Sequence, residues 1–284
     1  MTAKNLSESG ENPLVPNAKL RAMYTKMVEA RVLDEATIKR LKARGRRRIT
    51  TVRGQEAIRI STTTDLTEND LVSDSKLSAS MGLLLGGDPA SLLRGLTQKK
   101  DPEEVFAEAG IGRFLRIVDD EEDRLRYAAG AALALKSQGH RGIVVAYAYK
   151  NEVPRAAWRR VLAPVAKLEL PILFVALSQK GASKSGAERA ELCNLARTAG
   201  VPGIPVDACD AVAVYRVVQE SLGRMRGGDG PVLIESVSWR IEGARGGTED
   251  PLKHLKEFLL ARKICDQAWF KQTDKAVRKR LSQK

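Results

Sequence analysis

The residues best placed for chemistry lie directly after an apolar stretch near the middle of the chain. The sequence runs Gly142-Ile143-Val144-Val145-Ala146-Tyr147-Ala148 and then turns polar at Tyr149-Lys150-Asn151-Glu152. An unbroken apolar run of this kind is typical of a parallel strand that is buried on both faces. Open α/β sheets bind their ligands outside the carboxyl ends of such strands. The four polar residues are therefore the first candidates for a binding or catalytic site.

Few other residues offer catalytic side chains. The chain has two histidines, His140 and His254, which speaks strongly against a histidine relay or a histidine-rich metal site. The three cysteines, Cys193, Cys209 and Cys265, lie far apart and lack metal-type spacing. Their number and separation predict free thiols that act as small hydrophobes, in a reducing, cytoplasmic compartment. His140 is expected to be a turn or cap residue.

The net charge of the chain gives information about its partners rather than about its fold. The formal net charge is +13, which favours an acidic partner or an anionic small molecule. Arg44–Arg48 and the basic C-terminal segment could form a polyanion-binding module, although a solvated surface is the simpler interpretation of the arginine run. Aromatic residues make up 5% of the chain and do not alternate with basic ones, which argues against nucleic acid. No apolar run is long enough to cross a membrane, and the N-terminus lacks the order of a signal peptide.

Strand and helix patterns alternate along the second half of the chain. Besides the stretch at 142–149, apolar strand patterns cover 171–177 and 231–239, and a shorter one covers Val206-Asp207. This alternation predicts an α/β fold, with a parallel sheet and helices on both faces. We expect a lead-in at 1–15, one α/β domain at 16–265, and a basic helix or tail at 266–284.

Helical periodicity and capping residues predict the elements between these strands. Pro164 lies inside one of the predicted helices and is expected to kink or split it. A short strand is expected at Leu71-Val72-Ser73. The predicted helices cover residues 14–44, 54–63, 127–137, 151–168, 188–199, 210–223, 248–264 and 266–281, with short helices after Ser75 and Asp88.

Several motifs resemble one family in their order along the chain, the alpha subunits of the thiamine diphosphate-dependent 2-oxo acid dehydrogenases of the pyruvate and branched-chain type. The resemblance covers about residues 15–265. The motifs that carry it are Met27-Val28-Glu29-Ala30-Arg31, Gly54-Gln55-Glu56-Ala57, Asp70-Leu71-Val72, Gly87-Asp88-Pro89, Gly130-Ala131-Ala132-Leu133-Ala134, Val206-Asp207-Ala208-Cys209-Asp210 with the helix that follows, Gly230-Pro231-Val232-Leu233-Ile234-Glu235 and Asp250-Pro251-Leu252.

The resemblance implies a thiamine diphosphate-binding fold and a beta-subunit partner. In that family the cofactor lies between the subunits. The alpha subunit holds the diphosphate and a divalent metal, and the beta subunit supplies the glutamate that activates the aminopyrimidine ring. A beta-subunit-like protein or a homodimer is therefore the expected assembly.

The positions that hold cofactor in the family are altered here. The family's Gly-Asp-Gly falls on Tyr149-Lys150-Asn151, so Lys150 replaces the metal-binding carboxylate. Mg²⁺ requires hard oxygen ligands, which an ammonium cannot provide. The second ligand position falls on Gln179 and the carbonyl ligand on Gly181. The diphosphate-contacting Tyr-Arg falls on Lys76-Leu77.

The family's histidine positions are also replaced. They fall on Thr50, Ala79 and Ala244. A literal Gly228-Asp229-Gly230 occurs, but it precedes a strand and is expected to be a turn. The cofactor-binding candidates are therefore Lys76, Leu77, Lys150, Asn151, Gln179 and Gly181, all at altered positions, with no metal ligand and no catalytic residue assigned.

Two interpretations of Lys150 follow. In the first, the cofactor site has been abandoned, so thiamine diphosphate and Mg²⁺ are lost and the chain is a pseudoenzyme with a structural or regulatory role. In the second, the ammonium replaces the metal and neutralises an anion directly, with Lys76 and Lys180 near it. The several independent losses favour abandonment. The alternative function is a divergent but active subunit for oxidative decarboxylation of a 2-oxo acid.

Overall fold

Within the part of the chain that the structure describes, five parallel strands form a single sheet in the order β1-β2-β3-β5-β4. The structure is a computed structural model, and it describes residues 12, 14–43, 51–75, 78–98, 100–178, 190–237 and 250–282. All four strand pairings are parallel, with Val144 opposite Ile172 and Leu173 opposite Val232. The strands are β1 (Leu71–Ser73), β2 (Val144–Tyr149), β3 (Ile172–Leu177), β4 (Gly203–Asp207) and β5 (Val232–Val237).

Helices cover both faces of the sheet. Because side chains alternate along a strand, Val145 and Tyr147 of β2 pack into one hydrophobic cluster while Val144 and Ala146 pack into the other. The first cluster contains side chains of α1 (Asn17–Ala43), α2 (Glu56–Thr63) and α9 (Ala211–Gly227). The second contains those of α6 (Glu121–Ser137), α7 (Arg155–Lys167) and α8 (Glu191–Thr198). The predicted parallel α/β sheet with helices on both faces is confirmed.

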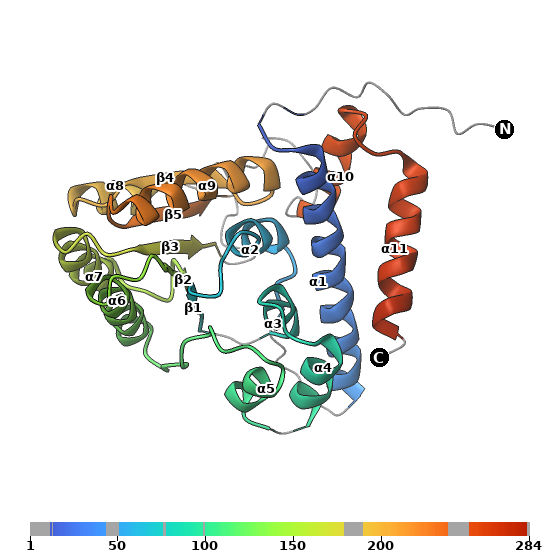
Figure 1. Cartoon of the computed structure of the whole chain (residues 1–284), viewed down its shortest axis with the longest axis horizontal. Helices are drawn as coiled ribbons and strands as arrows, with labels where there is room; N and C mark the ends of the chain where they lie inside the picture. Colours follow the sequence, from blue (N-terminus) through green and yellow to red (C-terminus); the bar gives the residue numbers. More distant parts are fainter. Residues whose placement is uncertain are drawn as a thin grey trace.

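The remaining helices extend the first face away from the sheet. Figure 1 shows α6 and α7 at one side of the molecule, and α1 and α11 at the opposite side. The short helices that follow β1 in the sequence connect it to α6 and β2. These outer helices are α3 (Ala79–Leu84), α4 (Pro89–Thr97), α5 (Pro102–Glu108), α10 (Pro251–Ala261) and α11 (Gln267–Ser282).

The final helix α11 packs lengthwise against α1. Phe270 and Val277 are buried in the first cluster, and the rings of Phe270 and Tyr24 meet edge to face at 4.8 Å. Arg280 and Arg278 form ion pairs with Glu29 and Glu35 of α1. The basic residues of α11 are thus partly neutralised by acidic residues of the same chain.

Some predicted boundaries were wrong for local physical reasons. Helix α6 begins at Glu121 rather than Tyr127, because the Asp120 side chain caps it by accepting a bond from the Asp123 amide. Helix α7 begins after Pro154 and runs without a break through Pro164, so it is not split. Strand β4 begins at Gly203, since Gly203 pairs with Leu233 of the neighbouring strand. Pairing with β5 therefore makes β4 longer than the strand that the local sequence pattern predicts.

Candidate functional site at the carboxyl edge of the sheet

Lys150 lies just beyond the last residue of β2 and reaches across the sheet edge to β5. Its Nζ donates to the Ser236 carbonyl oxygen at 2.9 Å and lies 3.4 Å from Glu235 Oε1. The side chains of Lys150 and Glu235 are 16% and 2% exposed. Because β2 and β5 flank β3, this contact joins the carboxyl ends of two strands that do not pair directly.

Glu235 also connects the sheet to helix α8. Its second carboxylate oxygen accepts a hydrogen bond from the Cys193 amide at 2.7 Å, in the first turn of α8. Amide groups in the first turn of a helix lack partners within the helix and favour a negative charge. Ser178, which follows β3, donates through Oγ to the same Ser236 carbonyl at 2.8 Å. The three strand ends and α8 thus share one polar cluster, the Lys150 cluster, made of Lys150, Glu235, Ser236, Ser178 and Cys193.

The Lys150 cluster does not fit a magnesium site. A magnesium ion would require oxygen ligands where Lys150 places an ammonium, and the nearby carboxylate of Glu235 is committed to that ammonium and to an amide. Within the described residues there is no group of three or more His, Cys, Asp or Glu side chains able to hold a metal. The side chains that are present therefore form an internal ion pair rather than a set of metal ligands.

The Cys193 thiol is unsuited to nucleophilic chemistry. Burial, reinforced by the negative charge of Glu235, raises the pKa of Cys193 to about 12. The reactive form of cysteine is the thiolate, which is scarce at neutral pH when the pKa is that high. All three cysteines, Cys193, Cys209 and Cys265, lie in the described part of the chain and form no disulfide, as the sequence predicts. The cluster consequently offers no cysteine nucleophile.

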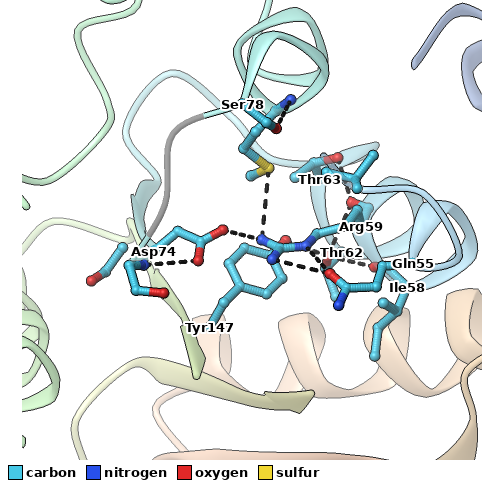
Figure 2. Close-up of polar contacts among 12 residues, drawn as sticks. Gln55, Ile58, Arg59, Thr62, Thr63, Asp74, Ser78 and Tyr147 are labelled. Carbon is cyan, nitrogen blue, oxygen red and sulfur yellow. Dashed lines mark hydrogen bonds and ion pairs between the residues drawn. The ribbon is translucent and has the colours of Figure 1, made fainter. Parts of the chain in front are cut away.

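A second polar cluster lies on the opposite face of the sheet and centres on Arg59 of α2. Figure 2 shows the Arg59 guanidinium between Asp74 and Gln55, with the Tyr147 ring beside it. Arg59 forms an ion pair with Asp74, and its Nε and Nη2 lie 3.3 Å from Gln55 Oε1. The guanidinium carbon lies 4.1 Å from the centre of the Tyr147 ring.

We call Arg59, Asp74, Gln55 and Tyr147 the Arg59 cluster. This cluster extends to Tyr149, the residue that precedes Lys150. Gln55 donates through Nε2 to the Tyr149 hydroxyl at 3.2 Å, and the Tyr147 hydroxyl and Thr62 Oγ1 lie 2.5 Å apart. Burial by itself lowers the pKa of Arg59, but Asp74 and the tyrosines outweigh it, so the pKa is raised. Burial raises the pKa of Tyr147 to about 12. The cluster is thus a paired, permanently charged connection between α2 and the sheet.

The structure describes two of the six predicted site residues. Lys150 is partly buried within the Lys150 cluster, whereas Asn151 is exposed in the turn that follows. Lys76, Leu77, Gln179 and Gly181 lie outside the described residues. Ala79, at one of the family's histidine positions, is buried in α3. Of these two described candidates, Lys150 belongs to the Lys150 cluster and Asn151 faces solvent.

Sequence reasoning missed the partner of Lys150. Glu235 is the single charged residue of the buried strand Val232–Val237. A carboxylate in a buried strand needs a cation or hydrogen-bond donors, so the sequence did contain a signal that Glu235 would be paired. Which cation pairs with it depends on strand order, which the sequence does not state.

Comparisons with known proteins find that the chain is similar to dehydrogenase subunits. The family model "Dehydrogenase E1 component" matches residues 175–247, which include β5 and Glu235. The pyruvate dehydrogenase E1 component subunit alpha of Staphylococcus aureus is 31% identical over 133 residues, 45% of this chain and 35% of that protein. The corresponding Bacillus subtilis subunit is 26% identical over 273 residues, 89% of this chain and 70% of that protein.

Two further matches are a branched-chain relative and one solved structure. The 3-methyl-2-oxobutanoate dehydrogenase subunit alpha of Mycobacterium tuberculosis is 26% identical over 259 residues, 86% of this chain and 66% of that protein. A Mycobacterium smegmatis structure described as a thiamin diphosphate-dependent enzyme aligns with a TM-score of 0.42 and 14% identity, over 65% of this chain and 31% of that one.

The sheet order and the helices on both faces define a parallel α/β protein of the type that the sequence predicts. Within that class, the chain is similar to the alpha subunits of the pyruvate and branched-chain 2-oxo acid dehydrogenases, so the resemblance is confirmed. The alignment to the Staphylococcus aureus protein spans about a third of that relative's length. No helix in the described part of the chain is long and apolar enough to cross a membrane.

Proposed function

We propose that this E1 alpha-like chain is catalytically degenerate and acts as a structural or regulatory partner of a beta-subunit-like protein. In this proposal neither thiamine diphosphate nor Mg²⁺ binds at the carboxyl edge of the sheet. The remaining role of the chain is to preserve the alpha-subunit surface. The curated relatives carry the names of alpha subunits, which supports a beta-type partner for this chain as well.

One observation carries the proposal. The Lys150 ammonium is bonded to Glu235 and to the Ser236 carbonyl. The sequence resemblance predicts that Lys150 takes the position of the family's metal-binding carboxylate, and this contact supports the loss of the metal. A lysine retained for binding a phosphate would be expected to direct its ammonium toward the solvent side of the strand ends. Lys150 instead cross-links β2 to β5, which is the behaviour of a structural residue. The three described cysteines, which form no disulfide, support our further proposal of a cytoplasmic location.

Calorimetry tests the cofactor directly. Thiamine diphosphate is titrated into the purified chain with and without Mg²⁺, and again after mixing with a co-purified beta-subunit-like protein. The Bacillus subtilis alpha subunit with its own beta subunit serves as the positive control. We expect no Mg²⁺-dependent heat from this chain in either form. Tight, Mg²⁺-dependent binding by the chain or its complex would reject the proposal.

The alternative is an active, divergent subunit for oxidative decarboxylation of a 2-oxo acid. It predicts turnover by the complex that is lost in a folded Lys150→Ala variant, with circular dichroism as the check on folding. Our proposal instead predicts that pyruvate and branched-chain 2-oxo acids are not oxidised by the wild-type complex. Turnover that depends on Lys150 would establish the alternative.

A further inference from the structure

The solvent side of the final helix α11 carries a row of three lysines. Lys271, Lys275 and Lys279 are exposed, and because four residues make about one helical turn, they share one side of the helix. Phe270 and Val277 are buried in the cluster that contains α1 and therefore mark the opposite side. Figure 1 shows α11 at the outer edge of the molecule, beyond α1. We call the three lysines the α11 lysine row.

The two arginines of the same helix have acidic partners, whereas the lysine row has none among the described residues. Arg278 forms ion pairs with Asp274 of α11 and with Glu35 of α1. Arg280 forms an ion pair with Glu29 of α1. No ion pair or hydrogen bond between described residues involves the ammonium groups of the lysine row. The basic charges beside α1 are thus compensated within the chain, and those on the solvent side are not.

The lysine row is unfavourable for the chain on its own. Like charges four residues apart on a helix repel each other and destabilise it. Basic residues near the C-terminal end of a helix complement its dipole, which accounts for Lys279 in the last turn but not for Lys271 or Lys275. An anionic group placed beside the row would remove the repulsion. The lysine row therefore indicates an anionic partner outside this chain.

The surroundings of the lysine row favour a protein segment over a membrane or a nucleic acid. A helix that enters a membrane surface needs a free apolar face, and the apolar face of α11 is buried against α1. Single-stranded nucleic acids stack on exposed aromatic rings, but Trp269 and Phe270 of α11 pack against Tyr24. Consecutive lysines rise by about 6 Å along the helix, which matches carboxylates at every fourth residue of a second helix.

The remaining exposed positions on this side of α11 indicate a transient contact. They are the small or polar residues Ala268, Gln272 and Ala276, with no large apolar side chain among them. Permanent subunit interfaces are larger and more apolar than such a surface allows. The motifs shared with the dehydrogenase alpha subunits also end before α11, at Asp250-Pro251-Leu252. The row is therefore better suited to a partner other than the beta-subunit-like protein.

We propose that the α11 lysine row is a docking site for an acidic helical segment of a further partner protein, with one carboxylate opposite each ammonium. Ion pairs on a surface are individually weak, so the affinity comes from the three pairs together and falls as salt is added. The proposal is independent of the proposed function, because α11 contributes no side chain to the Lys150 cluster or to the Arg59 cluster.

Fluorescence anisotropy of a labelled peptide tests the docking site on the full chain. The probe is a short alanine-rich peptide with glutamate at every fourth position, and its control peptide carries glutamine in place of glutamate. At low salt we expect the wild type to bind the glutamate peptide. Lys271→Gln/Lys275→Gln/Lys279→Gln should bind it at least about tenfold more weakly, a change of about 1.4 kcal/mol. Equal binding of the two peptides by the wild type would overturn the proposal.

A second triple variant separates the lysine row from net charge. Arg159→Gln/Lys167→Gln/Arg216→Gln removes the same charge from exposed positions of α7 and α9, and it should bind the glutamate peptide like the wild type. An equal loss of binding in both triple variants would assign the effect to net charge and overturn the proposal. So would binding by the lysine-row variant that equals binding by the wild type.

Circular dichroism separates a lost docking site from a lost fold. The lysine-row variant should unfold at the temperature of the wild type or above it, because the repulsion between like charges is removed. Lys275→Gln alone should weaken peptide binding by about twofold to fourfold, which keeps the test open if the triple variant does not fold. Unchanged binding by a folded Lys275→Gln variant would count against the proposal.

Parallel titrations separate the other possible occupants. Vesicles that contain phosphatidylserine and a single-stranded DNA oligonucleotide are compared with the glutamate peptide. Tighter binding of either one than of the peptide, lost in the lysine-row variant, would reject the acidic protein segment. The peptide is also added to the complex with a beta-subunit-like protein, which we expect to bind it. A complex that no longer binds the peptide would show that the row is covered by that subunit, and this would equally overturn the proposal.

Discussion

Lys150 and Glu235 illustrate how a buried pair depends on both of its members. The Glu235 side chain is 2% exposed, and its carboxylate contacts the Lys150 ammonium and accepts a hydrogen bond from the Cys193 amide. Removing the Lys150 ammonium would leave this carboxylate buried without that cation. Breaking one side of a buried pair is costly, because the remaining charge stays desolvated, whereas replacing both members can be nearly neutral. Each member of the pair is therefore needed for stability as long as the other is present, whether or not either takes part in catalysis.

We expect Lys150→Met to lower the free energy of unfolding by about 2–4 kcal/mol. The double variant Lys150→Met/Glu235→Gln should recover most of this loss, because the amide leaves no unpaired charge. Urea denaturation followed by circular dichroism measures both values. Lys167→Met, at an exposed position, is the control for removing a lysine. Equal stability of Lys150→Met and the wild type would contradict a structural role for the pair.

At the scale of elements, Arg31 joins three helices through its guanidinium. It lies 2.7 Å from Glu56 of α2 and bonds both carboxylate oxygens of Asp250, each at 2.7 Å. Asp250 also caps α10, since its side chain accepts a bond from the Leu252 amide at 2.9 Å. One aspartate thus starts α10 and attaches it to α1. The Asp250-Pro251-Leu252 motif of the sequence has a clear physical role in this contact.

We expect Asp250→Ala to destabilise the protein by about 1–2 kcal/mol, since it removes both the cap and a half-exposed ion pair. Asp250→Ser keeps a capping oxygen and should cost less. Burial alone would raise the pKa of Asp250, but Arg31 outweighs it and lowers the pKa. The contribution of the Arg31–Asp250 ion pair to the free energy of unfolding is therefore present at neutral pH and is lost as the pH falls below about 4. Thermal unfolding of the three proteins between neutral and acidic pH measures both effects, and equal losses for alanine and serine would exclude the cap.

At the scale of the whole molecule, the chain closes with a helix that covers α1. The sequence suggests a basic helix or tail at 266–284, separate from a domain at 16–265, and that boundary remains a prediction. In the structure Phe270 and Val277 of α11 are buried at 3% and 4% exposure, and Tyr24 of α1 contacts both Trp269 and Phe270. These contacts imply that α11 contributes to the stability of the α1 layer.

We expect deletion of residues 266–284 to destabilise the protein by about 4 kcal/mol or more, because it removes a buried phenylalanine and valine and exposes Tyr24. Differential scanning calorimetry should show a clearly lower unfolding temperature. A deletion of only the last two residues, which lie beyond α11, is the matched control. An unchanged unfolding temperature after the longer deletion would show that residues 16–265 fold independently.

The sequence by itself determined the parallel strands, most of the helices and the resemblance to the alpha subunits, because apolar runs, capping residues and motif order are local properties of the chain. The exchange of a carboxylate for Lys150 stays a prediction. The sequence left open what Lys150 contacts. Only the tertiary structure decided that β5, distant in sequence, lies beside β3 and brings Glu235 and the Ser236 carbonyl within reach of the Lys150 ammonium. It likewise decided that the alanine-rich helix α6 faces solvent with Tyr127 and Leu133. Strand order and helix orientation are fixed by burial of the whole core, so no local pattern could supply them.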